Sequence, residues 1–308
     1  MGVTGRTLGL VRSHDQQRLR DRTLNRRLDT DGYVVVRVAD NDIIEQALDV
    51  YQQCDSGIDS GYYASIHSTS RQYKEDVDRE LQQIVWPPCD RILLDHQCLV
   101  AAMMVKPPTG STVVPVHQDW NTIDESRGAG LTCWMPLTPI TRVEGLMRVL
   151  PGSHHYLQGL RGSPGFPNPY QEIAERIDRE LMIDVEVQVG EVMVMDGRLL
   201  HTTGQNTSGR TRVAAYMNAI PEDAQPLHFY RRDDGGVEGY QVDRAFFTSF
   251  NIGEQPTGEL FLQLANYERP TITMPDLLRM HRSTKRPLAR RRAASLLAPD
   301  RLQSETVA

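Results

Sequence analysis

The chain is poor in cysteine and places its cysteines without a pattern. Only four occur in 308 residues, Cys54, Cys89, Cys98 and Cys133. No two of them form a Cys-x-x-Cys pair, and their spacing is irregular. Zinc sites and redox motifs use such pairs, and a disulfide framework needs partners at regular spacing. We therefore expect reduced, mostly buried thiols and neither a disulfide framework nor a zinc site.

Long apolar runs and excess positive charge are also missing. The longest runs, such as CLVAAMMV at 98–105, are far shorter than the roughly 20 residues that span a bilayer. The first twenty residues contain no apolar signal core, so we expect a cytoplasmic protein. A formal net charge of −6 gives no general affinity for nucleic acid or for an anionic membrane, and neither is an expected partner.

The expected domain organisation is simple, because the chain contains no internal repeats. With 39% hydrophobic residues it can bury the core of one larger β-type domain, placed at 28–275. Residues 1–27 are Arg-rich and weakly patterned, and we expect a frayed N-terminal arm. Residues 276–308 contain a basic run, which is typical of a solvated tail. A long insertion at 156–182 is expected to form part of a lid over the substrate.

The hydrophobic periodicity predicts a mainly β fold with flanking helices. Apolar stripes at helical spacing over 41–51 and 72–85 indicate two helices that pack on the outside of a sheet. From Cys98 onward the pattern is that of strands. The predicted strands cover 98–106, 113–120, 131–137, 144–150, 183–189, 192–201 and 212–220, and the predicted strand before them is DGYVVVRV at 31–38.

A possible metal site ends one of these strands, in the triplet His117-Gln118-Asp119. Side chains of an extended strand alternate, so the imidazole of His117 and the carboxylate of Asp119 should face the same side. His201, in GEVMVMDGRLLHTTGQN, is placed to supply a second imidazole. Two His and one carboxylate on one face leave positions open on non-haem Fe(II). One His-x-Asp triplet can arise by chance among nine His and forty acidic residues, but this one follows an apolar strand and precedes a polar loop.

A basic residue, Arg212, lies close in sequence to His201, the second histidine of the predicted site. Arg212 lies eleven positions after His201, beyond the turn-like segment 204–209, and opens a predicted strand. A hairpin there would bring both side chains to the same cavity, where the guanidinium could bind a carboxylate through two hydrogen bonds. The alternative is that Arg212 only pairs with a surface carboxylate near the end of its strand.

Taken together, the motifs resemble the phytanoyl-CoA dioxygenase family of Fe(II)- and 2-oxoglutarate-dependent oxygenases. The matching segments are DGYVVV at 31–36, MVKPP at 104–108, HQD at 117–119, Trp134, LPGSH at 150–154, GEVMVMDGRLLHTTGQN at 190–206, and Arg212. The resemblance covers roughly residues 28–220. It implies a double-stranded β-helix, the jelly-roll arrangement also found in cupins.

The resemblance also implies roles for individual residues. The iron ligands would be His117, Asp119 and His201, which would also be the catalytic residues. The distal carboxylate of 2-oxoglutarate would be held by Arg212 and Thr203, and its pocket would be lined by Gln118 and Trp134. The metal positions show no departure from the family, since the carboxylate is present where related halogenases have a small residue.

The activity that follows is that of a dioxygenase using Fe(II), 2-oxoglutarate and O2. It would hydroxylate, or otherwise oxidise, an unactivated C–H bond and release succinate and CO2. The expected substrate is a small molecule such as a secondary metabolite, with an acyl- or carrier-linked substrate left open; the oligomeric state is not predicted. The alternative is a cupin-like metal protein that binds or isomerises a small ligand without 2-oxoglutarate.

Overall fold

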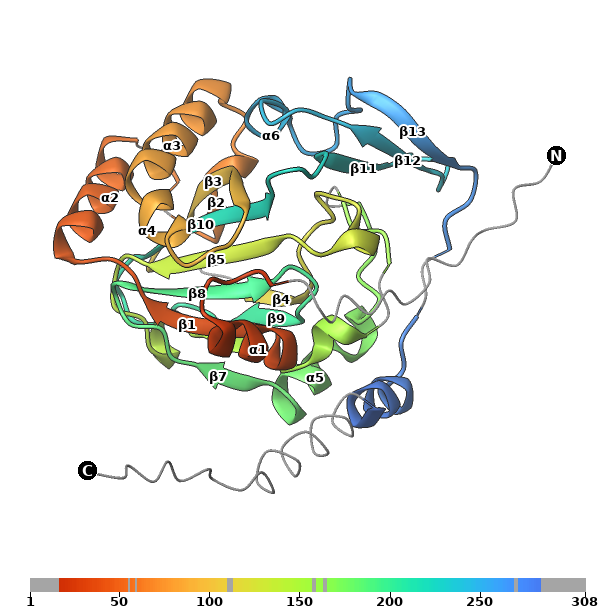
Figure 1. Cartoon of the computed structure of the whole chain (residues 1–308), viewed down its shortest axis with the longest axis horizontal. Helices are drawn as coiled ribbons and strands as arrows, with labels where there is room; N and C mark the ends of the chain where they lie inside the picture. The colour runs from red at the N-terminus through yellow and green to blue at the C-terminus, as the bar shows by residue number, and fades with distance from the viewer. Residues whose placement is uncertain are drawn as a thin grey trace, which may run out of the picture.

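The computed structural model describes residues 17–54, 56–58, 60–109, 113–156, 159–162, 165–268 and 271–283 (Figure 1). Among these residues the strands form three antiparallel sheets, with helices packed on the outside. The prediction of a mainly β fold with flanking helices is confirmed.

The larger sheet has six antiparallel strands in the order β1-β8-β5-β10-β3-β2. Their bounds are Tyr33–Arg37 for β1, Tyr63–Ala64 for β2, His96–Lys106 for β3, Leu131–Pro136 for β5, Glu191–Asp196 for β8 and Arg212–Pro221 for β10. Neighbours in this sheet are distant in sequence, as is typical of a jelly roll. The central strands β10 and β3 are buried along almost their whole length, which explains their continuous apolar sequences.

A second sheet of four strands lies against the inner face of the first. Its order is β4-β9-β6-β7, with bounds Val114–His117, His201–Thr203, Met147–Val149 and Ile183–Val185. Side chains of both sheets meet in one apolar cluster, in which Trp134 and Met193 of the larger sheet pack with Met147 and Val149 of the smaller one. Two facing antiparallel sheets are the jelly-roll arrangement that the sequence predicts.

Alternation along the strands divides the core into layers. In β8, Val192 and Val194 pack under the outer helices, whereas Met193 and Met195 point between the sheets. The outer helices are α2 at Asn41–Gln53, α3 at Arg71–Ile84 and α4 at Trp86–Asp90. The helices predicted over 41–51 and 72–85 are therefore confirmed, with ends shifted by one or two residues.

The starts of α2 and α3 are fixed by side-chain caps. The carboxylate of Asp40 accepts from the backbone N–H of Ile43, and the hydroxyl of Ser70 accepts from that of Tyr73. In the part of the chain that the structure describes, five short 3-10 helices also lie around the sheets. They are η1 at Ser65–His67, η2 at Glu125–Arg127, η3 at Arg142–Glu144, η4 at Ser153–His155 and η5 at Gln171–Ile173.

The N-terminal arm predicted over 1–27 is wrong from residue 17 onward. Leu19 and Leu28 are fully buried, and helix α1 at Arg22–Asp31 is capped by Asp21. The sequence signal failed because α1 has few apolar residues and is held partly by polar contacts, among them the ion pair between Arg18 and Asp29 of the helix. The part of the predicted arm at 1–16 lies outside the described residues.

The insertion at 156–182 contains α5, Ala174–Glu180, and this helix packs on the outer face of the smaller sheet. Ile177 of α5 packs with Val116 and Leu200, whose side chains project from the outer face of the smaller sheet. Residues 274–283 are also helical, and their Leu277 joins the same outer cluster beside α5 (Figure 1). The helix of the insertion thus covers the outside of the smaller sheet. Helical structure continues past residue 275, which was the predicted end of the domain. Residues 284–308 of the predicted tail lie outside the described part.

A third sheet follows β10 and was not predicted. Strands β11 at Leu227–Arg231, β12 at Val237–Gln241 and β13 at Glu259–Leu264 form a three-stranded antiparallel sheet, with α6 at Phe246–Ser249 between the last two (Figure 1). β13 escaped prediction because its apolar residues Leu260 and Phe261 are exposed. The glycine Gly239 interrupts the pattern of β12, where a Cβ would clash with Phe261.

The four cysteines are free thiols, as predicted, and three of them are buried. In the described part of the chain, no helix combines the length and the apolar character that crossing a membrane requires.

A buried group of charges joins the N-terminal segment to the end of β8. Asp196 is fully buried and accepts hydrogen bonds at 2.8 Å from both Arg18 and Arg198. Burial alone would raise the pKa of this carboxyl, but the two guanidinium groups outweigh it and hold the pKa well below its usual range. The carboxylate therefore stays charged in the folded protein at neutral pH.

We predict that Asp196→Asn lowers the free energy of unfolding by about 3–5 kcal/mol, because two buried guanidinium groups lose a shared anion and Arg198 keeps no other ion-pair partner among the described residues. Urea unfolding at neutral pH measures the difference. A carboxyl whose folded pKa is depressed stabilises the fold above its unfolded pKa and ceases to do so as pH falls through the folded pKa. The gap between wild type and variant should therefore close only in strongly acidic buffer. The exposed acid Glu180, substituted as Glu180→Gln, is the control; an equal effect of both substitutions would contradict the prediction.

Candidate metal centre

Three side chains that are distant in sequence converge between the sheets. His117 ends β4 and His201 begins β9, and the two residues are direct cross-strand partners with ring centroids 4.2 Å apart. Oδ1 of Asp119 lies 3.9 Å from Nε2 of His117 and 3.6 Å from Nε2 of His201. One ligand atom from each residue lies within 4.8 Å of the others, close enough for one metal ion. The structure thus brings together the three residues that the sequence predicted as ligands.

The orientation of both imidazoles is set by the backbone. Nδ1 of His117 lies 2.8 Å from the carbonyl of Pro115, and Nδ1 of His201 lies 2.9 Å from that of Leu199. A carbonyl only accepts, so each Nδ1 carries the proton and each Nε2 keeps its lone pair for a metal. Burial and the neighbouring His201 lower the pKa of His117 to about 4, so this imidazole is neutral at pH 7. Neutral imidazole is the form that binds metals.

Asp119 lies just past the end of β4 and is held at three points, two on its backbone and one on its carboxylate. Its backbone N–H donates to Gly197 at 2.9 Å, and its carbonyl accepts from Nε of Arg161 at 2.5 Å. Its Oδ2 accepts from the hydroxyl of Thr132 at 2.5 Å. These contacts leave Oδ1 as the oxygen that faces the two imidazoles.

Arg212 does not share a hairpin with His201, and that prediction is wrong. Its strand β10 lies in the six-stranded sheet, whereas β9 belongs to the four-stranded sheet opposite. Because both inner faces look into the same space, the two side chains still point toward one interior. Arg212 is 1% exposed, donates to the carbonyl of Gly145 at 2.9 Å, and stacks its guanidinium 5.3 Å from the ring of Trp134.

The guanidinium of Arg212 is a buried cation with unused hydrogen-bonding capacity. It forms no ion pair with any residue that the structure describes, and its Nε has no partner there. Burial lowers the pKa of Arg212 to about 10, partly offset by Tyr62. The structural alternative, a pair with a surface carboxylate, does not fit a side chain this deeply enclosed. A buried guanidinium with free N–H donors favours binding an anion.

Thr203 shares the same interior. It lies two positions after His201 in β9, so the two side chains face the same side. Its Oγ1 is buried and has no partner among the described residues. Lys106, the cross-strand partner of Arg212 in β3, donates from Nζ to the carbonyls of Thr203 and Gly204. Burial, followed by the charge of Arg212, lowers the pKa of Lys106 to about 7. This end of the interior is therefore electropositive.

Gln118, expected to line the same pocket, is placed elsewhere. Its side-chain amide donates to the carbonyl of Arg198 at 2.5 Å, in the turn between β8 and β9. The residue lies between two inward-facing ligands, and alternation turns its side chain to the other face. The amide therefore fastens the strand end of His117 to the turn that precedes His201.

Sequence reasoning missed Tyr62, Thr132 and the role of Lys106. Burial raises the pKa of Tyr62 to about 12, with opposing smaller effects from Arg212 and Asp119, so the phenol lies near both the cation and the metal ligands. Nothing in the local sequence around Tyr62 indicates this position. Lys106 belongs to the segment MVKPP that contributed to the family resemblance, and its burial in a strand was the available signal.

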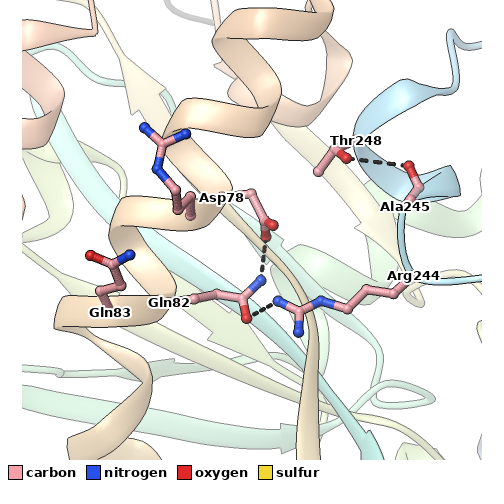
Figure 2. A pocket seen from close by; sticks show the side chains of 7 residues that line it. Asp78, Gln82, Gln83, Arg244, Ala245 and Thr248 are labelled. Carbon is pink, nitrogen blue, oxygen red and sulfur yellow. Dashed lines mark hydrogen bonds between the residues drawn. The ribbon is translucent and has the colours of Figure 1, made fainter.

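A hollow on the surface between α3 and α6 has no part in this centre (Figure 2). Gln82 accepts from Arg244 and donates to Asp78 at 2.7 Å, so its polar groups bind one another. None of the converging residues lines it.

The chain matches the family model for phytanoyl-CoA dioxygenase (PhyH) over residues 28–214. The chain belongs to this family. The phytanoyl-CoA dioxygenase of Arabidopsis thaliana is 25% identical over 121 residues, which are 38% of this chain and 42% of that protein. Dioxygenase FUM3 of Gibberella moniliformis is 28% identical over 95 residues, which are 29% and 27% of the two chains. The chain thus spans less than half the length of these relatives.

A solved structure agrees on the fold. The non-heme alpha ketoglutarate dependent carbocyclase SnoK from nogalamycin biosynthesis superposes with a TM-score of 0.53 at 19% identity, covering 79% of this chain and 96% of that one. The groups that the resemblance to this family implies are Fe(II) and 2-oxoglutarate. The residues present fit both groups: a His-Asp-His cluster for the iron, and a buried cation with an orphaned Nε for a carboxylate.

We predict that His117→Ala and His201→Ala each abolish tight metal binding while the fold persists, because neither imidazole belongs to the apolar clusters of the core. Anaerobic titration with Fe(II), or with Co(II) as a stable substitute, measures binding, and circular dichroism measures the fold. His155→Ala is the matched control, since this histidine contacts the carbonyl of Asp29 away from the cluster. Near-normal metal affinity in either ligand variant would remove that residue from the centre.

Proposed function

We propose that this protein hydroxylates an unactivated C–H bond of a small-molecule substrate, such as a secondary metabolite, and releases succinate and CO2. The observation that carries the proposal is the convergence of two imidazoles and one carboxylate in an interior that also holds a buried, unpaired guanidinium. The metal would bind between the sheets, and the cosubstrate would extend from it toward the guanidinium. A cytoplasmic location and an acyl- or carrier-linked form of the substrate stay predictions from the sequence.

The three ligands would hold the iron through Nε2 of His117, Nε2 of His201 and Oδ1 of Asp119. Iron bound in this way, with 2-oxoglutarate and O2, supplies the oxidising power for the C–H bond. The protein supplies geometry: backbone carbonyls fix both ring tautomers, and a hydrogen bond from Thr132 fixes the carboxylate. Ligands held in advance lose little conformational freedom when the metal binds.

Arg212 and Thr203 would bind the remote carboxylate of 2-oxoglutarate. That carboxylate undergoes no chemistry, so a fork of N–H donors and a hydroxyl serve to anchor it. The ring of Trp134 and the carbonyl of Gly145 hold the guanidinium of Arg212 in place. Its orientation therefore does not depend on a bound anion. Gln118 is not part of this proposal, because its amide is engaged outside the interior.

We predict that Arg212→Ala raises the 2-oxoglutarate concentration needed for half-saturation by about a hundredfold or more, with little change in Fe(II) affinity. Breaking a buried charge pair from one side costs about 3–5 kcal/mol, and each 1.4 kcal/mol is about tenfold in affinity. Arg212→Lys should recover only part of the loss, because a point charge does not reproduce the planar fork. Succinate formation at varied 2-oxoglutarate measures the effect.

The matched control for this experiment is Arg176→Ala, on the exposed face of α5, where the side chain pairs with Glu180. It should leave the 2-oxoglutarate requirement unchanged. If Arg212→Ala also left it unchanged, Arg212 would have no role in cosubstrate binding.

The reaction itself is tested by supplying small molecules with wild-type protein, Fe(II), 2-oxoglutarate and 18O2. The substrate is the compound that stimulates succinate formation, and hydroxylation predicts one labelled oxygen atom in its product. If a compound stimulates succinate formation but its product is more oxidised and carries no label, the reaction is an oxidation other than hydroxylation. Ligand turnover that proceeds without any succinate would favour the second candidate, a cupin-like protein that isomerises its ligand.

A further inference from the structure

A row of buried polar side chains runs along the inner face of β5 and β10 and ends at Asp119. Thr132 is fully buried in β5, and its cross-strand partner in β10 is Asn218, which is 3% exposed. The phenol of Tyr216, on the same face of β10, contacts both of them. Thr122 closes the row by donating to Oδ1 of Asn218 at 3.1 Å. Polar groups are rare in so enclosed a place unless they are hydrogen-bonded and serve a purpose.

We propose that Thr132 is a positioning residue that makes Asp119 bind the iron through one oxygen only. This inference rests on the proposed role of Asp119 as a ligand. The Thr132 hydroxyl donates to Oδ2 at 2.5 Å, on the side of the carboxylate away from the imidazoles. With Oδ2 engaged, only Oδ1 faces the metal. The coordination position that a second oxygen would fill then stays open for cosubstrate or O2.

The direction of the Thr132 hydroxyl is itself determined by its neighbours. Because Oδ1 of Asn218 accepts from Thr122, the amide N–H groups of Asn218 are turned toward Tyr216. Burial and the nearby Asp119 raise the pKa of Tyr216, so its phenol keeps its proton and can donate to Thr132. The Thr132 oxygen therefore accepts from the phenol and directs its own proton to the carboxylate. The row sets one orientation for the ligand before any metal arrives.

The test compares Thr132→Val, which keeps the shape and removes the hydroxyl, with Thr132→Ser, which keeps the hydroxyl. Each apoprotein is titrated with Co(II), and the visible absorption of the bound Co(II) is recorded. We expect the Val variant to bind about 10–100-fold more weakly, as is typical when a hydrogen bond to a metal ligand is lost. We also expect weaker visible bands, because Co(II) absorbs less as its coordination number rises. The Ser variant should match wild type in both readouts.

Two further variants keep the result interpretable. Thr248→Val, which removes a buried hydroxyl bonded to Ala245 far from the centre, should leave Co(II) binding and absorption unchanged. Tyr216→Phe removes the donor to Thr132 and should shift both readouts in the direction of the Val variant by a smaller amount. It also serves as the test if Thr132→Val does not fold.

The outcomes separate this inference from the proposed function. If wild type itself fails to bind Co(II) tightly, the metal centre is wrong, whatever the variants do. If wild type binds tightly and Thr132→Val binds with the same affinity and the same spectrum, the positioning role of Thr132 is overturned. A loss of affinity that Thr132→Ser does not rescue would also overturn it, because the cause would then be packing and not the hydroxyl.

Discussion

The pairing of β4 with β9 is the contact on which the centre depends. It sets His117 opposite His201, and a register irregularity between Val114 and His117 lets the two strands end with both rings on the inner face. A slip of one residue would turn one imidazole outward, since side chains alternate along a strand. The pairing is only a few residues long, so its register is maintained by neighbours: the Gln118 amide, the Arg161 guanidinium and the apolar cluster around Val116.

The interior holds buried positive charges, and their burial by itself destabilises the fold. Arg212 is enclosed without an anion in the described part of the chain, and Lys106 lies beside it. Natural proteins retain such costly groups where a ligand will compensate for them. The ring of Trp134 supplies part of the compensation in the absence of a ligand, because an aromatic face attracts a guanidinium. Cosubstrate binding should therefore stabilise the fold as well as complete the site.

The sequence predicted most of the two main sheets through strand periodicity, and it predicted the cluster of His117, Asp119 and His201 through the His-x-Asp triplet and the family resemblance. It failed where the decisive contacts are between distant polar residues. Arg18 and Leu19 lack a helical or strand pattern, yet they are buried through partners more than seventy positions away. Gln118 was assigned by resemblance to the pocket, but its amide is set by a carbonyl eighty residues later. The hairpin assumed for Arg212 was wrong because strands adjacent in sequence lie in opposite sheets, which no local pattern reveals.

The ion pairs of Asp196 connect Arg18, near the start of the described part of the chain, to the turn that leads into β9. The same turn carries the carbonyl that accepts from Gln118. The family match begins at residue 28, ten positions after Arg18. A shortened protein that starts at that boundary would keep every proposed ligand and every proposed cosubstrate residue, yet it would lack Arg18, one of the two arginines that pair with Asp196. In that shortened protein the turn before His201 would therefore be held less firmly. The segment that matches the family model is shorter than the part of the chain that holds the candidate site in place.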